Sequence, residues 1–196
     1  MEIYETIPYK GYNINIHFDT CASNPFEEFD QLGVLYQNRR DSHSNGKQLR
    51  KLKEFDDGNG YIDWKRLKRD YIWLRVYSYE HSGICLKTSR NGNPFSCPWD
   101  SGFYGIIARR KDEIRNEYGW KLINNARRKL IETYFENEIE LYSEYLEGNV
   151  FGYTVTDDED NELDSCWGFY GMDHEKSGLF EYAKGFIDYQ VSKQSA

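Results

Sequence analysis

The sequence predicts an α+β protein with a mostly antiparallel sheet, braced by a long amphipathic helix and a C-terminal helix. Short segments of alternating apolar residues dominate the first half of the chain, which is typical of strands. A long segment with helical spacing of apolar residues follows at 121–146. A second pair of strand segments and a closing helical segment complete the order of elements.

The first strand is expected at 9–18, where apolar and polar residues alternate with a period of two. One face would carry Tyr12, Ile14, Ile16 and Phe18, and the other Asn13, Asn15 and His17. This alternation is typical of a half-buried strand, so His17 is expected at the surface.

Three further strand segments, 71–79, 84–88 and 103–108, lie in the centre of the chain. Residues 80–83 separate the first two, which predicts a hairpin. A segment rich in Pro, Cys and Trp precedes the third, so it is expected in a loop between strands, where functional groups are commonly presented. A later hairpin is expected from 150–156 and 163–170 about an acidic turn.

Helices are expected at 111–118, 121–146 and 179–191. Gly119 follows the first of them and is a suitable C-cap. In the long helix the apolar positions near 3.6-residue spacing are Ile123, Ala126, Leu130, Tyr134, Leu141, Tyr142 and Tyr145.

The chain of 196 residues fits a single domain over 1–196, with a polar loop or insertion at about 38–62. We expect a cytoplasmic protein, because no segment has the length and apolar character of a membrane span or a signal peptide. The four cysteines form no CxxC pair, so we expect reduced thiols, no metal and no cofactor.

Two segments share an unusual set of residues. The first, PFSCPWDSG, covers 94–102, and the second, DSCWGFYG, covers 164–171. Because Pro, Gly and Trp each impose a geometry that other residues do not, we expect Trp99 and Trp167 to be largely buried. The shared composition also predicts that the two segments approach each other, with Asp100 or Ser101 near Asp164 or Cys166.

These motifs, together with YSYEHSG at 77–83, NPxExxDxLG at 24–33 and YLxGxVxGYxV at 145–155, resemble an uncharacterised family found in bacteriophages, plasmids and conjugative elements. The resemblance covers most of the chain in the same order. This chain has Glu80 where the family usually has Asp, and Asn38 where a His precedes an Arg pair. The resemblance implies a mobile-element context and transfers no catalytic assignment.

Residues that could carry chemistry cluster in and near the two motifs. A cysteine nucleophile needs a neighbouring base and an orienting carboxylate. Cys97 or Cys166, with His81 and with Asp100 or Asp164, supplies those residue types. Asp100, Asp164 and His81 could also hold a divalent metal, although no local spacing supports that site. The alternative is that the motifs are structural and shape a binding surface made of Trp99, Ser101, Ser165 and Trp167.

Charge is segregated along the chain. The overall net charge is −8, yet residues 132–165 contain twelve acids and no Lys or Arg. Glu136, Glu140 and Glu144 belong to the C-terminal half of the long helix, where the helix dipole disfavours acids, so we interpret them as recognition residues. A basic cluster at 39–53 could contact nucleic acid.

Together these observations predict a mobile-element protein that binds a host protein or ribonucleoprotein effector. The context implied by the resemblance makes an inhibitor of a restriction or CRISPR system the expected function. Two alternatives stay open. One is a hydrolase of nucleic acid or nucleotides that uses His81, Asp100 and a cysteine, and the other is a nucleic-acid mimic built on the acids of 132–165.

Overall fold

The structure is a computed structural model that describes residues 2–38 and 49–194. It confirms the α+β class and divides the chain into two compact units. Unit 1 comprises Met1–Ser23 and Glu147–Ala196, and unit 2 comprises Asn24–Leu146. The sequence predicts a single domain, whereas the long helix and the C-terminal helix here belong to separate units with separate cores.

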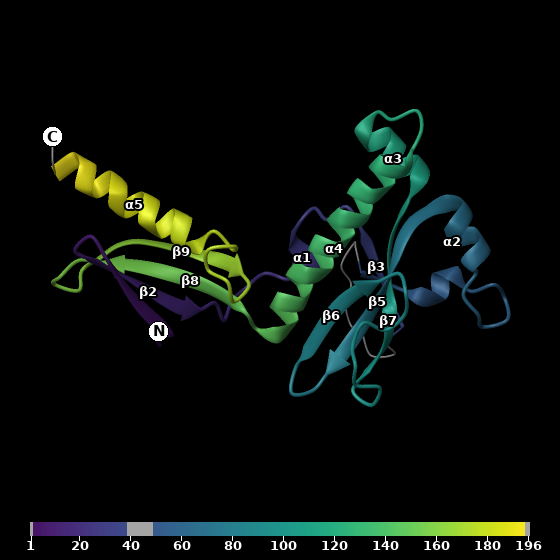
Figure 1. Cartoon of the computed structure of the whole chain (residues 1–196), viewed down its shortest axis with the longest axis horizontal. Coiled ribbons are helices and arrows are strands. Elements are labelled where there is room, and N and C mark those ends of the chain that lie inside the picture. Colours follow the sequence, from purple (N-terminus) through teal and green to yellow (C-terminus); the bar gives the residue numbers. More distant parts are fainter. Residues whose placement is uncertain (1, 39–48, 195–196) are drawn as a thin grey trace. The chain divides into compact units, whose positions relative to one another are not determined.

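Unit 1 is a four-stranded antiparallel sheet with the strand order β1-β2-β8-β9 and one packed helix (Figure 1). Its elements are β1 (Glu5–Tyr9), β2 (Tyr12–Phe18), β8 (Val150–Thr156), β9 (Glu162–Tyr170) and α5 (Leu179–Gln194). Alternate strand residues such as Ile14 and Tyr153 pack against Ala183 and Ile187 of α5. The two-residue period of a strand therefore leaves the other face of this sheet to polar side chains.

Unit 2 contains a five-stranded sheet with the order β4-β3-β7-β5-β6, in which β3 and β4 pair in parallel and the other pairs are antiparallel. The strands are β3 (Val34–Gln37), β4 (Leu49–Lys51), β5 (Tyr71–Glu80), β6 (Ile84–Ser89) and β7 (Ser101–Arg110). The helices are α1 (Pro25–Glu28), the 3₁₀ helix η1 (Leu52–Phe55), α2 (Trp64–Asp70), α3 (Lys111–Tyr118) and α4 (Asn125–Glu147).

Helices cover both faces of the unit 2 sheet, and Figure 1 shows α4 and α2 on opposite sides of it. On one face, Leu74 and Val76 of β5 join a core with Ile131, Phe135 and Ile139 of α4. On the other face, strand residues pack with η1 and α2; this core contains Tyr36, Tyr71, Ile106, Ala108, Leu52, Phe55 and Leu67. Alternation along β5 thus sends successive side chains to two different cores.

Several local predictions are confirmed, and others are wrong for identifiable reasons. Gly119 caps α3 in the left-handed conformation, with φ 64°. Helix α4 begins at Asn125 because the Asn124 side chain accepts the backbone N–H of Arg127 at 2.9 Å. The predicted polar loop at 38–62 contains β4 and η1, since Leu52 and Phe55 are buried; residues 39–48 lie outside the described part. None of the described helices combines the length and apolar character needed to cross a membrane.

Candidate functional site

The PFSCPWDSG segment forms the loop between β6 and β7, as predicted, and its own side chains fix its backbone. The Asn93 carboxamide accepts the backbone N–H of Phe95 at 3.0 Å and donates to the Ser101 hydroxyl at 2.8 Å. The Ser101 hydroxyl in turn donates to the backbone carbonyl of Cys97. These bonds cross-link the loop from its first residues to the start of β7.

Three of the predicted catalytic residues meet beside this loop. The Cys97 thiol donates to Oδ2 of Asp100 at 3.2 Å, and Nδ1 of His81 lies 3.9 Å from the same oxygen. The backbone carbonyl of Asp100 accepts the N–H of Glu80 at 2.7 Å, which joins the loop to the β5–β6 turn that carries His81. Asp100 therefore lies between the thiol and the imidazole.

This order of groups differs from that of an activated cysteine. A nucleophilic thiol donates to a base, commonly an imidazole, which a carboxylate then orients. Here the thiol and the imidazole both contact the carboxylate, and within the described residues no hydrogen bond joins Cys97 to His81. The described chain also contains no group of three or more His, Cys, Asp or Glu side chains that could hold a metal ion. The geometry fits a hydrogen-bonded surface cluster better than a reaction centre.

Trp99 is 92% exposed, so the prediction that it is largely buried is wrong. The side chain that attaches this loop to the sheet is Phe95, whose ring lies 5.7 Å from that of Tyr79 and beneath the Lys87 ammonium at 5.4 Å. Because Phe95 occupies the position next to the sheet, the indole at the loop tip has nothing to pack against. A Trp exposed to this extent on a fixed loop is uncommon.

The DSCWGFYG segment lies in strand β9 and the turn after it, and it gives its tryptophan a different environment. The Trp167 indole lies on Gly152 of the neighbouring strand, where an added Cβ would be 2.1 Å from the ring. It also lies 5.7 Å from the ring of His17, and it is 37% exposed. The prediction of a largely buried Trp167 is therefore wrong as well, since more than a third of the residue is exposed.

The other candidate residues of β9 divide between the two faces of the sheet. Asp164 accepts the Tyr153 hydroxyl at 2.8 Å, and Cys166 packs against the core that α5 covers. Ser165 and Trp167 lie on the opposite face, where they line a depression of about 500 Å³ with His17, Thr154 and other residues of unit 1. The thiol and the indole of this motif thus serve different surfaces.

His17 belongs to the polar face of unit 1, but it is only 5% exposed, so its expected position at the surface is wrong. Nδ1 of His17 lies 3.0 Å from the backbone carbonyl of Glu2, and Nε2 lies 3.1 Å from the Thr154 hydroxyl. A carbonyl can only accept, so Nδ1 carries a proton and donates to Glu2, while the Thr154 hydroxyl is the hydrogen-bond partner of Nε2. Both ring nitrogens are satisfied, which makes His17 a structural residue of this face.

The two motifs belong to different units, with Cys97 in unit 2 and Cys166 in unit 1. Each motif is stabilised by contacts within its own unit, as described above. A site shared by Asp100 or Ser101 with Asp164 or Cys166 stays a prediction.

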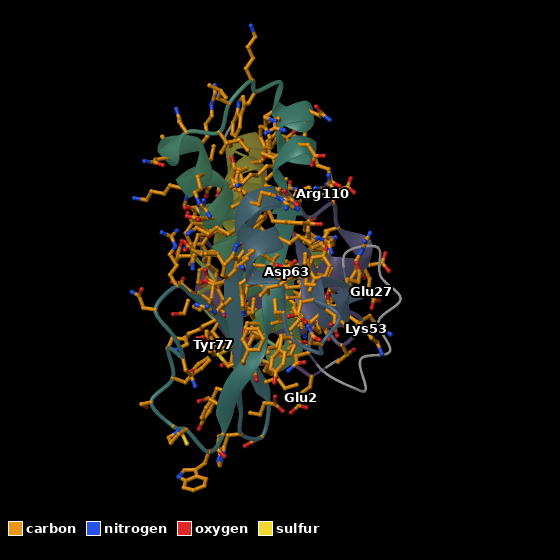
Figure 2. All side chains as sticks on the ribbon, turned by 90° about the vertical axis from the view of Figure 1, so that its right-hand side faces the viewer. Glu2, Glu27, Lys53, Asp63, Tyr77 and Arg110 are labelled. Carbon is orange, nitrogen blue, oxygen red and sulfur yellow. The ribbon has the colours of Figure 1, made fainter. Side chains whose placement is uncertain are left out.

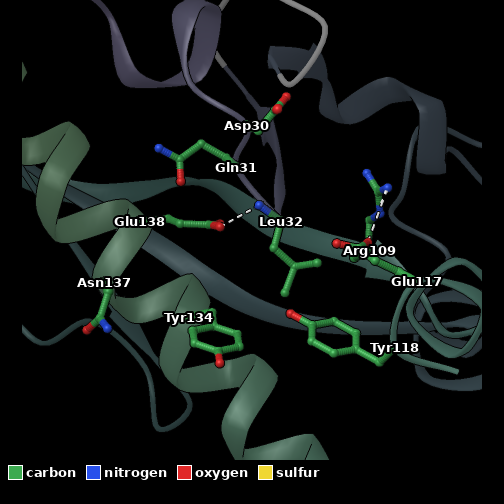
Figure 3. A pocket seen from close by; sticks show the side chains of 9 residues that line it. All are labelled: Asp30, Gln31, Leu32, Arg109, Glu117, Tyr118, Tyr134, Asn137 and Glu138. Atoms are coloured by element: carbon green, nitrogen blue, oxygen red, sulfur yellow. Dashed lines mark hydrogen bonds and ion pairs between the residues drawn. The ribbon is translucent and has the colours of Figure 1, made fainter. Parts of the chain in front are cut away.

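A pocket of about 590 Å³ in unit 2 involves residues that the motifs did not single out (Figure 3). Asp30 and Gln31 lie on one side of it, and Tyr118 and Tyr134 lie opposite. Glu138 of α4 projects into it from the helix and is almost fully buried. Its carboxylate accepts the backbone N–H groups of Leu32 at 2.6 Å and Gly33 at 2.9 Å.

Burial raises the pKa of Glu138 to about 7, although the two N–H groups act in the opposite direction. A carboxyl group that titrates near neutral pH can act as an acid or a base. Gly33 nevertheless supports a structural role, because a Cβ at this position would lie 2.7 Å from the Glu138 carboxylate and 2.5 Å from Ile107. Glu138 thus holds the DQLG segment to α4, and the glycine allows its close approach.

The acids of α4 serve more than one purpose. Glu132 is buried, and its two oxygens pair with Arg90 and with Arg128, the latter at 2.9 Å. Glu132 and Glu138 therefore stabilise the fold, so two acids of this half of the helix have a structural role. Glu136 and Glu140 are exposed, Glu144 is half-buried, and Glu136 lies 4.0 Å from the Arg90 guanidinium. A role of these three acids in recognition stays a prediction.

The run of acids at 132–165 also divides between the units at residue 147. Unit 1 contains 14 Asp and Glu against 4 Lys and Arg, while unit 2 contains 19 against 21. Neither unit by itself contains the whole acidic run, so neither unit alone supports a nucleic-acid mimic that uses the run as one continuous surface. The basic cluster at 39–53 is described only from residue 49, where Arg50 pairs with Glu54 at 3.5 Å.

Comparison of the chain with protein-family models, with curated proteins and with solved structures yields no significant match. The site must therefore be interpreted from its own geometry. The sequence analysis missed Glu138. Gly33, in the segment DQLG at 30–33, could have indicated it, because a glycine often marks a place where another group lies close to the backbone. The sequence analysis also missed Arg75, which lies between aromatic residues at alternate positions of β5.

Proposed function

We propose that this protein acts by binding a host macromolecule and that Trp99 is its main contact residue. The mobile-element context implied by the family resemblance makes a defence effector, either a restriction enzyme or a CRISPR ribonucleoprotein, the partner class that we propose. The site of action would then be the host cytoplasm.

The observation that supports this proposal is the 92% exposure of Trp99 on a loop cross-linked by its own hydrogen bonds. Tryptophan is enriched among the few residues that contribute most of the binding energy of protein interfaces. A loop that is already fixed loses little conformational entropy on binding, so the burial of the indole contributes more fully to affinity. Hydrogen bonds within the loop engage the side chains of Cys97, Asp100 and Ser101, whereas the Trp99 side chain is available to a partner.

The test compares three tagged proteins: wild type, Trp99→Ala and Tyr61→Ala. Tyr61 is the matched control because it is a 73% exposed aromatic residue on a turn of the same unit. Proteins captured from a bacterial lysate, with and without nuclease, would be identified and the purified partner titrated against each variant. We expect Trp99→Ala to weaken binding at least about 30-fold, which corresponds to roughly 2 kcal/mol, and Tyr61→Ala to change it little.

Equal binding by wild type and Trp99→Ala would refute the proposal. The alternative hydrolase requires that His81→Ala abolish function and Trp99→Ala leave turnover intact. The location of Asp100 between the thiol and the imidazole disfavours that outcome. Cleavage of nucleotides or oligonucleotides by the purified protein, lost in His81→Ala, would favour the hydrolase instead.

A further inference from the structure

One face of the unit 2 sheet carries a row of aromatic and basic side chains that the proposed function does not use. Trp73, Arg75, Tyr77 and Tyr79 occupy alternate positions of β5, so they point to the same side of the sheet. The opposite side is the one that α4 covers. On the side of the row, η1 and α2 cover the end of β5 at Tyr71 and pack against Trp73 and Phe103, so the part of the row from Arg75 to Tyr79 lies beyond that core. We call this row and its neighbours the aromatic–basic face, and Figure 2 views that side of unit 2 with Tyr77 and Asp63 labelled.

The row begins with a stack of one cation and two indoles. The rings of Trp64, at the start of α2, and Trp73 lie 5.2 Å apart. The Arg75 guanidinium lies 5.0 Å from the first ring and 5.5 Å from the second. Arg75 is half-buried and has no carboxylate partner among the described residues, so its guanidinium can still donate to an anionic ligand.

Further aromatic residues extend the row along the sheet. Tyr77 lies opposite Phe103 of β7, with 6.0 Å between the rings, and opposite Lys87 of β6. Tyr79 continues the row to Phe95, over which the Lys87 ammonium lies. Lys87 is exposed and has no acidic partner in the described chain. From Trp73 to Tyr79 the row spans about 20 Å at the rise of a β-strand.

The pairing of β5 with β7 shifts between Val76 and Tyr77. Shifts of this kind, including β-bulges, change the direction in which side chains point and are over-represented next to functional sites. Here the shift places Tyr77 opposite Phe103, while Tyr104 of β7 joins the core under α4. The half-buried rings on this face therefore follow from how the strands pair.

We propose that the aromatic–basic face binds single-stranded nucleic acid. Unpaired bases stack on aromatic rings and on guanidinium planes, while cations such as Lys87 contact the phosphates. A sheet with aromatic residues on one face commonly accommodates two or three stacked bases, which suits a row of this length. Charge complementarity favours this ligand over a neutral peptide, because both cations of the row lack acidic partners.

This proposal is independent of the proposed function, because Trp99 lies outside the row. Fluorescence anisotropy with fluorescein-labelled oligo(dT) and oligo(U) of about 20 nucleotides tests it directly. We expect micromolar binding by wild type and by Trp99→Ala. Arg75→Ala should weaken binding at least about tenfold. Lys87→Gln should reduce the slope of log affinity against log salt concentration by about one, which corresponds to the loss of one phosphate contact.

Arg127→Ala is the matched control, because its guanidinium lies 4.7 Å from the Trp120 ring elsewhere in unit 2. It removes the same charge and a similar stack, so it should leave oligonucleotide binding unchanged. If Arg75→Ala fails to fold, Tyr77→Leu replaces it, since leucine keeps the apolar bulk and removes the ring. A loss of at least about fivefold is expected for Tyr77→Leu.

Four results would overturn the proposal. They are no binding of either oligonucleotide by the wild type, an equal effect of Arg75→Ala and Arg127→Ala, equal affinity for duplex and single strands, and equally effective competition by polyglutamate. The last of these would identify a face for acidic peptides instead of bases.

Discussion

Trp99 and Trp167 stand in motifs of nearly the same composition, yet their environments differ. Gly152 of the neighbouring strand provides a flat surface for Trp167, and the His17 ring lies beside the indole. The loop that carries Trp99 uses Phe95 to pack on the sheet, so the indole at its tip stays in solvent. The neighbouring strand, and not the motif, therefore decides whether a tryptophan contributes to stability or stays available for binding.

The largest expected effect tests this comparison directly. Trp167→Ala should lower the free energy of unfolding by about 2–4 kcal/mol, somewhat less than for a fully buried tryptophan. Trp99→Ala should change it by less than about 0.5 kcal/mol, because the indole has few contacts to lose. Urea unfolding measures both changes, and equal destabilisation by the two variants would contradict the comparison.

The pH dependence of stability should distinguish the two units. In unit 2, the pKa of Glu138 is raised from 4.5 to about 7, so the folded state binds more protons between these values. The stability of unit 2 should therefore fall as the pH rises through that range, by at most about 3 kcal/mol.

In unit 1, burial lowers the pKa of His174 from 6.5, so the unfolded state binds more protons. The stability of unit 1 should fall as the pH drops below about 6.5.

Amide hydrogen exchange reports on each unit separately, through amides of α4 and of β8. Wild type should be compared with Glu138→Gln and His174→Gln, because other carboxylates also titrate in this range. Each substitution should flatten the pH response of its own unit and leave the other unchanged. A common response of both units to either substitution would show that they unfold together.

The contact between Gly152 and Trp167 predicts a coupled pair of smaller effects. Gly152→Ala should lower the free energy of unfolding by about 1–3 kcal/mol, because the new methyl group meets the indole. In the double variant with Trp167→Ala this clash disappears, so the two effects should be less than additive. A double-mutant cycle measures the coupling, and full additivity would show that the indole avoids the methyl group at no cost.

The smallest stability effect is expected for three acids of α4, of which Glu136 and Glu140 are exposed and Glu144 is half-buried. Changing Glu136, Glu140 and Glu144 together to Gln should alter the free energy of unfolding by less than about 0.5 kcal/mol. The same variant should associate more slowly with the partner and with a weaker salt dependence. Glu132→Gln is the control on the same helix, and it should cost about 1.5–3 kcal/mol because both carboxylate oxygens are paired. Unchanged association by the triple variant would leave these acids without a role in recognition.

Local patterns predicted the longer elements, because apolar residues recur with the period of a strand or a helix. The strands at 71–79 and 84–88 and the helix ending before Gly119 are examples. The predicted apolar face of the long helix is wrong in part, since Leu130 and Tyr134 are exposed. Its buried apolar residues are Ile131, Phe135, Ile139 and Tyr142. The meeting of His81, Asp100 and Cys97 was also predictable, since a hairpin and the adjoining loop place them at one end of the sheet. Period-two alternation could not show that His17 would be buried, because the buried polar face of unit 1 forms only when Thr154 and Glu2 lie beside it.

By itself the sequence determined the α+β class, the two later hairpins, the helices after residue 110 and the loop that presents Trp99. These follow from interactions between residues close together in the chain, which leave a periodic or compositional trace. The sequence did not show that the segment 9–18 contains the turn between β1 and β2, nor did it predict the short elements between residues 25 and 70. Only the tertiary structure decided that strands from both ends of the chain form one sheet and that Glu138 holds Leu32 and Gly33. It alone also placed Arg75 between two indoles and left Trp99 in solvent. Each of these depends on a partner brought near by folding, and a side chain's environment includes neighbours that its local sequence does not contain.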